Sequence, residues 1–280
     1  MYLKMKVCIE KLKDNLQPII QIVFMIASLF LPTIVNVTDW IQFFFQNTEI
    51  NFETAKYYFL LKAGNWGIGI ILMFFVLFKI RKVNTDKLFN TRNVYHNYPY
   101  IWYFVCAKIL GFTKCNLKLV PIFMQFKLVL NDTFAEYNVG SEDDYPIIEE
   151  EEIVVRKVNW TSGKEVNLVL ADTYPIVATQ IPNSKSVFPT LFIMRKRPDQ
   201  SRYYSPKFIA KIVDEVRNLP KDMTIVNVFP TTNAKHTKKI AGDAFKLADR
   251  GNVKKLVIFP QDNKGERKFE EKGKIIYNYR

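Results

Sequence analysis

The chain has 280 residues, 49% of them hydrophobic, and a formal net charge of +13 at pH 7. Its length provides one domain of ordinary size plus an appendage. Three widely spaced cysteines without a CxxC pair argue against a disulfide framework or a thiolate zinc site, and two histidines exclude a histidine-rich metal site. Residues 1–78 contribute only +1, so residues 79–280 carry +12, which favours an anionic partner such as a lipid headgroup, a nucleotide or nucleic acid.

Two apolar segments near the N-terminus predict transmembrane helices. The first, from Pro18 to Val37, has no charge and is about as long as a helix that crosses a hydrocarbon core. No small-x-small cleavage pattern follows it, which disfavours the alternative of a signal peptide. The second, from Ala63 to Ile80, is nearly continuous in its apolarity, and its glycines suit close helix approach in a bilayer. A buried soluble helix is the alternative for this second segment.

The distribution of positive charge predicts the orientation of the spans. Lysines and arginines cluster before the first span and after the second, whereas the loop from Thr38 to Lys62 has only two lysines. The positive-inside rule therefore places both termini in the cytoplasm. The stretch "DWIQFFFQ" in the loop predicts a segment lying partly along the outer surface. Residues 98–112, which are apolar but too short to span, are either a core helix or a helix on the inner leaflet.

The remainder divides into a connector and an α/β domain. Residues 116–130 are β-branched and aromatic with one proline, and they predict two short strands or one bulged edge strand. Residues 140–152 hold seven acids and predict a solvated linker, or alternatively an internal competitor for an anionic ligand. We therefore expect spans within 1–82, a connector over 83–152 and a ligand-binding α/β domain over 153–280.

Alternating strands and helices predict the fold of that domain. Continuous apolar runs typical of strands covered on both faces end near Ala171, Arg195, Phe229 and Phe259. One helix is predicted from the Ser205-Pro206 cap to Leu219, and another from about Thr237 to Arg250, before Gly251. The fold class is therefore α/β, with a two-helix transmembrane hairpin followed by a cytoplasmic Rossmann-like domain with a largely parallel sheet.

Polar side chains gather in the loops after these strands, where open parallel sheets bind ligands. Hydroxyls, an amide, an ammonium and an imidazole at a helix N-terminus suit a phosphate, arginines bind phosphate bidentately, and tyrosines stack on bases. The candidate ligand-binding residues are Asp172, Thr173, Tyr174, Arg195, Arg197, Tyr203, Tyr204, Thr231, Thr232, Asn233, Lys235 and His236. Ordinary loop, capping and surface roles are the alternative for each of them.

Several catalytic motifs are missing from the sequence. It contains no GxGxxG, GxxxxGK[ST], HExxH or GxSxG, which argues against a dinucleotide oxidoreductase, a P-loop ATPase, a zinc protease and a serine hydrolase. His236 would be the candidate general base, but no evident nucleophile or paired carboxylate accompanies it. We therefore predict no catalytic residue, no metal and no cofactor, and favour binding over catalysis.

The layout resembles the two-span membrane effectors of bacterial antiphage signalling, which join their spans to a cytosolic CARF- or SAVED-type sensor of cyclic nucleotides. The resemblance rests on residues 18–80 and 166–260 and on the loops after "LVLADTYP" and "NVFPTTNAKH". It implies that binding of a cyclic or linear nucleotide second messenger to the sensor rearranges or oligomerises the spans in the lipid bilayer, so that the membrane leaks or depolarises. We therefore also expect a homo-oligomer. Two alternatives remain: a membrane-anchored enzyme acting on a nucleotide or phosphorylated headgroup, and a basic scaffold that holds nucleic acid or protein at the membrane.

Overall fold

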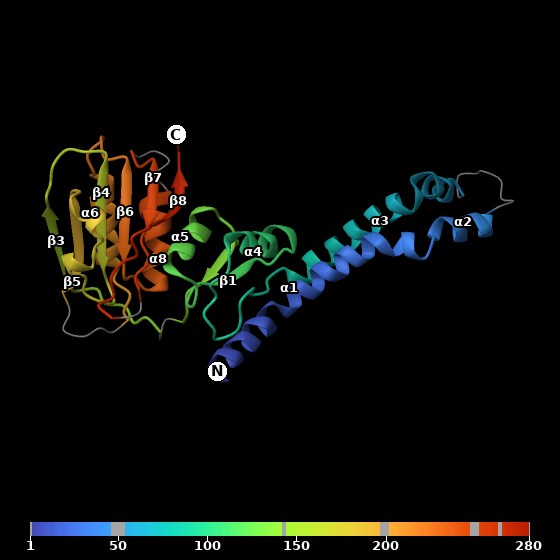
Figure 1. The fold of residues 1–280 in the computed structure, drawn as a ribbon, viewed down its shortest axis with the longest axis horizontal. Helices are drawn as coiled ribbons and strands as arrows, with labels where there is room; N and C mark the ends of the chain where they lie inside the picture. The colour runs from blue at the N-terminus through green and yellow to red at the C-terminus, as the bar shows by residue number, and fades with distance from the viewer. Residues whose placement is uncertain are drawn as a thin grey trace. The chain divides into compact units, whose positions relative to one another are not determined.

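The chain divides into two compact units (Figure 1). The computed structural model describes residues 2–45, 54–141, 144–196, 202–246, 252–262 and 265–279. The first unit contains residues 1–94 and 101–114, and the second contains residues 95–100 and 115–280. Apolar helices dominate the first unit, and a layered sheet forms the second.

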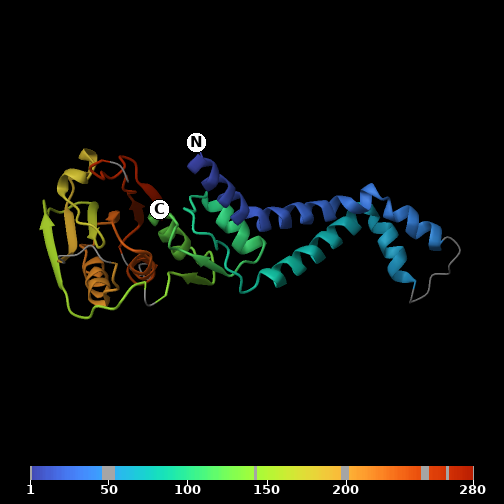
Figure 2. The ribbon, with the colours of Figure 1, turned by 90° about the horizontal axis from the view of Figure 1, so that it is seen from below.

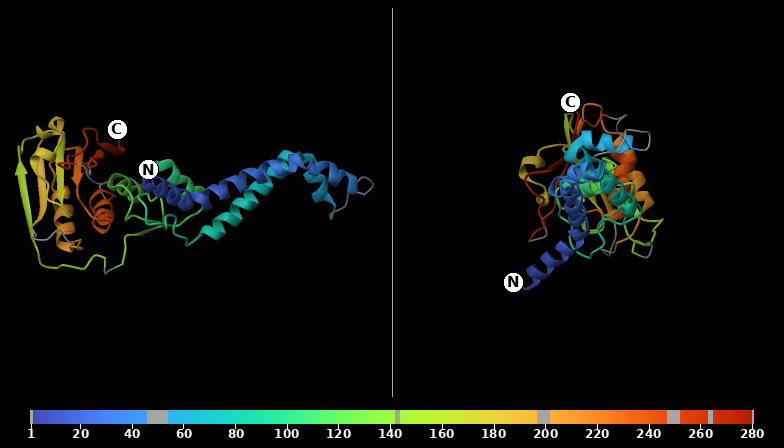
Figure 3. Two further views of the ribbon diagram at one scale, coloured as in Figure 1. Left: turned by 60° about the horizontal axis from the view of Figure 1, so that its bottom comes forward. Right: turned by 90° about the vertical axis from the view of Figure 1, so that its right-hand side faces the viewer.

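Two long helices form the first unit, α1 (Tyr2–Ile34) and α3 (Ala55–Asn84), together with the short helix α2 (Val37–Phe45). The long helices run alongside each other (Figure 3). Residues 9–34 and 59–84 are long and apolar enough to cross a membrane. Gly69 permits close approach, because a Cβ there would lie 2.1 Å from the Leu29 carbonyl oxygen. Helix α3 contains the whole of the second predicted span, Ala63 to Ile80. Helix α1 contains the first predicted span from Pro18 to Ile34 and ends three residues before Val37.

Polar side chains join α1 and α3 at two levels. At one level the Asn84 amide exchanges hydrogen bonds of 2.8–3.1 Å with Gln17 and Gln21. At the other, Asn65 donates to Asn36 at 2.7 Å. From Gln17 to Ile34, where α1 ends, the helical rise is about 26 Å, and from Asn65 to Asn84 it is about 28 Å. Both are close to the ~30 Å thickness of a hydrocarbon core. The two polar levels therefore bracket a segment whose length fits the membrane interior.

A short helix, α4 (Tyr100–Phe104), continues into a π-helical turn, η1 (Val105–Ile109), near the polar level formed by Asn84. The Trp102 indole donates to Asn15 Oδ1 at 2.6 Å, and Asn84 Nδ2 donates to the Leu110 carbonyl at 2.8 Å. From the sequence alone, this segment was either a core helix or a helix on the inner leaflet. The structure buries one of its faces and leaves the other exposed.

The second unit contains a six-stranded sheet. Its strands are β3 (Glu152–Val158), β4 (Glu165–Ala171), β5 (Thr190–Lys196), β6 (Ile225–Pro230), β7 (Lys255–Ile258) and β8 (Lys274–Asn278). The order is β3-β5-β4-β6-β7-β8, with four parallel inner strands and two antiparallel edges. The inner strands are the four that the sequence predicted. The sheet as a whole is mixed, because β3 and β8, which were not predicted, pair at its edges.

Helices cover both faces of this sheet (Figure 2). On one face lie α7 (Pro206–Arg217) and α8 (Ala234–Ile240), the latter continued by the π-helical segment η3 (Ala241–Lys246). On the other face lie the 3-10 turn η2 (Ala178–Gln180) and α6 (Asn183–Ser186). The core on that second face includes Phe229 and Phe259, whose rings stack at 4.6 Å.

The two predicted helices are present, with one corrected start. Ser205 caps α7 as predicted, since its Oγ accepts from the Phe208 amide at 3.1 Å. The second helix begins three residues before its predicted start, because Asn233 rather than Thr237 provides the cap. Its predicted C-terminal end, at Arg250 and Gly251, lies outside the described residues.

The prediction of strands at 116–130 is wrong for most of that segment. Residues Ile122–Leu130 form helix α5, and the only strand residues are in β1 (Lys114–Asn116), which pairs with β2 (Glu136–Asn138) in a two-stranded sheet. The Phe126 ring packs edge-on against Phe245 of η3 at 6.2 Å. This helix packing outweighs the β propensity of the aromatic and branched side chains, which is weak when tertiary contacts oppose it.

Candidate functional site

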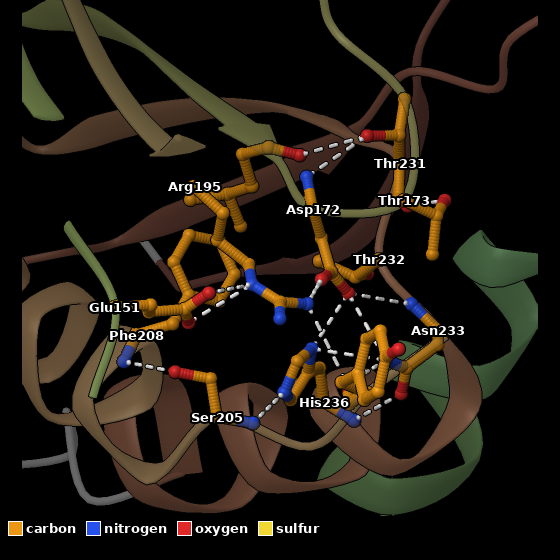
Figure 4. A network of polar contacts seen from close by, with 12 residues as sticks. Glu151, Asp172, Thr173, Arg195, Ser205, Phe208, Thr231, Thr232, Asn233 and His236 are labelled. Atoms are coloured by element: carbon orange, nitrogen blue, oxygen red, sulfur yellow. Dashed lines mark hydrogen bonds and ion pairs between the residues drawn. The ribbon is translucent and has the colours of Figure 1, made fainter. Parts of the chain in front are cut away.

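Asp172 lies at the centre of a buried polar network at the carboxyl ends of the inner strands (Figure 4). It directly follows β4, and its side chain is fully buried. Oδ1 accepts from Arg195 Nη1 at 2.5 Å, and Oδ2 accepts from His236 Nδ1 at 2.6 Å and from the Asn233 amide at 3.0 Å. One carboxylate therefore connects the ends of β4 and β5 with the start of α8.

Arg195, near the end of β5, is a buried cation rather than a surface arginine. Its Nε contacts both carboxylate oxygens of Glu151, at 2.9 and 3.0 Å, while Nη1 contacts Asp172. Its Nη2 is buried and has no hydrogen-bond partner among the described residues. Two carboxylates thus neutralise this guanidinium, yet Nη2 meets no acceptor within the part of the chain that the structure describes.

The loop after β6 supplies the helix cap and much of the hydrogen bonding. Asn233 caps α8, because its Oδ1 accepts from the His236 amide at 2.9 Å. The Thr232 and Thr237 hydroxyls are 2.7 Å apart. Thr231 Oγ1 donates to the Tyr174 carbonyl at 2.9 Å, and Thr173 Oγ1 donates to the Thr231 carbonyl at 2.5 Å. The polar loop predicted from "PTTNAKH" is therefore packed into the protein and ordered by its own contacts.

Both ring nitrogens of His236 are occupied. The Ser205 backbone amide donates to Nε2 at 2.8 Å, so this nitrogen is an acceptor without a proton. Nδ1 then carries the proton and donates a hydrogen bond to Asp172 Oδ2. The ring is fully buried beside Phe208. His236 consequently positions the α7 and α8 starts, and neither nitrogen is available to take a proton from a substrate.

Charge and burial oppose each other in the pKa values of this network. Burial raises the pKa of Asp172, but the His236 hydrogen bond and the Arg195 charge outweigh it, so the pKa lies below its ordinary value. Burial lowers the pKa of Arg195, and Asp172 and Glu151 more than reverse that effect. Asp172 and Arg195 are therefore held in their charged forms.

Tyr204 links this network to the acidic connector. Its backbone amide donates to the Pro146 carbonyl at 3.0 Å, and its carbonyl accepts from the Ile148 amide at 3.0 Å. Its ring lies 5.5 Å from that of His236, and Lys235 Nζ is 4.5 Å from the Tyr204 ring centroid. Residues 146–151, which we call the acidic strap, thus pair with Tyr204 and end with Glu151 on Arg195.

The remaining candidate residues differ in their surroundings. Tyr203 contributes a backbone carbonyl, which accepts from Asn233 Nδ2 at 3.1 Å. The Tyr174 ring is covered by the Arg267 guanidinium at 4.1 Å. Arg197 lies outside the described residues.

Sequence reasoning missed Glu151 and Ser205 as members of the network. Glu151 was hidden in an acidic run that reads as solvated linker. In the antiparallel register of β3 with β5, Ile153 lies opposite Arg195, and Glu151, two residues before Ile153, is diagonal to Arg195. This pairing is a tertiary feature, and a local pattern of residue types does not signal it.

A comparison with known families decides what kind of protein carries this arrangement. Residues 4–276 match the family described as the SMODS- and Ubiquitin system-associated 2TM effector domain. The chain belongs to this family. It is therefore a two-transmembrane effector of the antiphage type and a membrane protein, as its two long apolar helices indicate. The resemblance to two-span antiphage effectors is confirmed.

Solved structures of the Cap4 receptor of Acinetobacter baumannii, which contains a SAVED/CARF domain, are similar to this effector at 8% identity and a TM-score of 0.42. The alignment to the receptor with the cyclic trinucleotide 2'3'3'-cAAA covers 59% of this chain and 38% of the receptor. That to the receptor with 3'3'3'-cAAA covers 82% and 63%. The effector thus spans less than two thirds of either receptor chain. No curated protein matches it.

Proposed function

We propose that this two-transmembrane effector is a membrane-anchored cytoplasmic sensor whose α/β unit binds a nucleotide-like anionic ligand at the carboxyl edge of its sheet. The observation that carries the proposal is the Arg195 guanidinium, whose buried Nη2 has no hydrogen-bond partner among the described residues. An unsatisfied buried donor costs about 1–3 kcal/mol. A phosphate oxygen would satisfy this donor with a charge-assisted bond.

Glu151 gives the site a resting state. Its carboxylate lies on the Nε edge of Arg195, with only 4% of its side chain exposed. Carboxylate and phosphate both bind a guanidinium through paired oxygens. We therefore infer that a ligand phosphate displaces Glu151 and takes its place on Arg195. This is the internal competitor that the acidic run suggested as an alternative to a plain linker.

Tyr204 and Lys235 supply the other contacts expected for a nucleotide. A half-buried tyrosine ring offers a stacking surface for a base, and the Lys235 ammonium above it offers a second cation for phosphate. Thr231 and Thr232 are engaged inside the loop, so they order the site rather than face the ligand. The ligand would be a cyclic or linear nucleotide second messenger.

Displacement of the acidic strap provides a route from ligand to spans. A ligand shifts a conformational equilibrium only through different affinities for two states. Here the two states are the strap bound to Arg195 and Tyr204, and the strap released. Because the strap lies near the end of the connector, its release changes the tether between the α/β unit and the spans, in a homo-oligomer with both termini in the cytoplasm. The basic ends of α1 and α3 favour this orientation.

The contacts of His236 argue for binding of the ligand without turnover. Its two nitrogens are taken by Asp172 and Ser205, so the candidate general base is unavailable in this structure. We accordingly assign ligand recognition, and not hydrolysis, to this network.

The test uses the full chain in detergent with a panel of cyclic dinucleotides, cyclic trinucleotides and ATP, and follows the thermal unfolding midpoint. At a concentration of 100 Kd a ligand stabilises the folded state by about 2.7 kcal/mol. We expect at least one nucleotide to raise the midpoint. Arg195→Met should weaken its binding by about 10- to 100-fold, because a hydrogen-bonded charge contributes ~1.5–3 kcal/mol.

Two glutamine variants test the competition. Glu151→Gln should bind the same nucleotide more tightly than the wild type, because the displaced group is then neutral. Glu152→Gln is the matched control: Glu152 pairs with Lys196 at the surface, with 63% of its side chain exposed, and should bind as the wild type does. Equal effects of the two variants would refute the strap mechanism, and a panel without any stabilising nucleotide would refute the proposed sensor.

A further inference from the structure

Strand β3 forms one edge of the six-stranded sheet (Figure 1). Its inner side pairs with β5 along the whole strand, from Glu152 to Val158. Among the described residues, no strand and no backbone hydrogen bond occupies its outer side. An edge strand in this state presents a row of N–H and C=O groups that can pair with another chain.

The side chains of β3 are apolar in the middle and carry opposite charges toward the two ends. Ile153, Val154 and Val155 form the middle, and all three are half-buried. Glu152 precedes them and Arg156 follows them. Charges on an edge strand commonly oppose pairing. In β3, however, the acid and the base lie at opposite ends, so an antiparallel copy of the same strand brings opposite charges together.

Symmetry restricts how two copies of β3 can pair. Two identical antiparallel strands related by a twofold axis place residues of the same face opposite each other, so the pairing is centred on one residue and its copy. Centred on Val154, it sets Ile153 against Val155 of the second copy, and Glu152 against Arg156 of the second copy. Apolar residues then meet apolar residues, and a pair of opposite charges lies at each end.

The neighbouring registers lack this match. A pairing centred on Val155 sets Val154 against Arg156, and one centred on Ile153 sets Glu152 against Val154. A pairing centred on Arg156 brings the two copies of that arginine together, and like charges directly opposite each other are destabilising. The sequence of β3 is therefore complementary to itself in the register centred on Val154.

Contacts within each sheet extend this match beyond the two edge strands. The Glu152 carboxylate lies 3.0 Å from Lys196 Nζ on β5, and the Arg156 guanidinium lies 4.9 Å from the centroid of the Phe192 ring, also on β5. In the register centred on Val154 these pairs form one row, in which Glu152 lies between a cation of its own sheet and a cation of the second copy. Such a row of alternating charge stabilises the pairing.

We propose that β3 pairs antiparallel with β3 of a second copy of this chain, centred on Val154, so that the two sheets become one continuous sheet. The inference rests on the homo-oligomer of the proposed function and names its contact surface, but it does not involve the ligand. Strand pairing alone is a small interface beside the ~1,200 Å² of stable soluble complexes. The dimer therefore depends on two copies sharing one bilayer, which raises their effective concentration.

Disulfide crosslinking of the full chain in phosphatidylcholine vesicles, without nucleotide, tests the register. Val154→Cys places two thiols directly opposite each other, with Cβ atoms about 4.5–5.5 Å apart, where a disulfide needs little backbone movement. Val155→Cys is the matched control, because its two copies are diagonal to each other, about 7–8 Å apart. On a non-reducing gel we expect at least about fivefold more disulfide-linked dimer from Val154→Cys than from Val155→Cys. The wild type, with its three cysteines, gives the background.

A charge reversal tests the pairing of Glu152 with Arg156. In the Val154→Cys chain, Arg156→Glu sets two acids opposite each other and should lower the yield of dimer by about threefold or more. Lys274→Glu is the control, since it makes the same reversal on β8, the opposite edge strand, and should leave the yield unchanged.

Three results would overturn the inference. They are a yield from Val154→Cys no higher than that of the wild type, equal yields from Val154→Cys and Val155→Cys, and equal effects of the two charge reversals. A dimer from Val155→Cys alone would show a different register and would overturn it as well. Because no nucleotide is present, the result is independent of the nucleotide test of the ligand site.

Discussion

Replacing Asp172 by asparagine removes the charge that joins three elements of the α/β unit. Its two oxygens contact Arg195 at 2.5 Å and His236 at 2.6 Å, and all three side chains are fully buried. Removing one partner of a buried ion pair costs about 3–5 kcal/mol, because the other charge is left buried and uncompensated. Glu151 still faces Arg195 in the variant, so we expect a loss near the lower end, ~3 kcal/mol.

Hydrogen–deuterium exchange of the full chain in detergent measures this loss locally, without interference from the spans. Amides in β4 and β6 exchange through opening of the cooperative unit that contains them. A loss of ~3 kcal/mol should make their exchange about 100-fold faster. Asp214→Asn is the control, since Asp214 forms an exposed pair with Lys211 on α7 that contributes about 0–1 kcal/mol.

Exchange in β4 that changes by less than about threefold in Asp172→Asn would refute this reasoning, because a buried pair of this geometry would then be contributing no more than a surface pair. An equal effect of Asp214→Asn would refute it too.

The dependence of the thermal midpoint on pH provides an independent test of the Asp172 carboxylate. Because the pKa of Asp172 is lowered in the folded state, its contribution to stability is present above the ordinary carboxyl pKa of about 4. That contribution is lost as the pH falls through the lowered, folded-state pKa. The thermal midpoint of the wild type should therefore fall more steeply below about pH 4 than that of Asp172→Asn. Parallel curves in scanning calorimetry would contradict this assignment.

Three further substitutions probe individual elements. Ser205→Ala removes the cap of α7 and should cost ~1 kcal/mol, seen as faster exchange confined mainly to α7; unchanged exchange there would contradict the capping role. Gly69→Val would drive a Cβ toward the Leu29 carbonyl and should lengthen the distance between spin labels on α1 and α3, whereas an unchanged distance would contradict close packing. Asn84→Leu loses its bonds to two glutamines and should weaken the hairpin by about 0.6–2 kcal/mol, measured by unfolding in mixed detergent micelles; equal stability would contradict a stabilising role.

The spans, the inner strands and helix α7 were determined by the sequence itself. An uninterrupted apolar run needs no distant partner to exclude water, so the two long helices follow from residues that adjoin in the chain. The four inner strands have both faces covered, which makes them continuously apolar and easily recognised. Ser205 followed by Pro206 sets the start of α7 by local geometry alone.

Only the tertiary structure decided how those elements are completed. Residues 122–130 have a strand-like composition, and they become a helix through packing against η3, a partner more than a hundred residues away in the chain. The edge strands β3 and β8 depend on pairing with β5 and β7. Arg195 reads as a surface cation, yet Asp172 and Glu151 reach it from separate segments and bury its charge. Each of these outcomes depends on contacts between residues distant in the chain, and a local pattern of residue types does not contain that information.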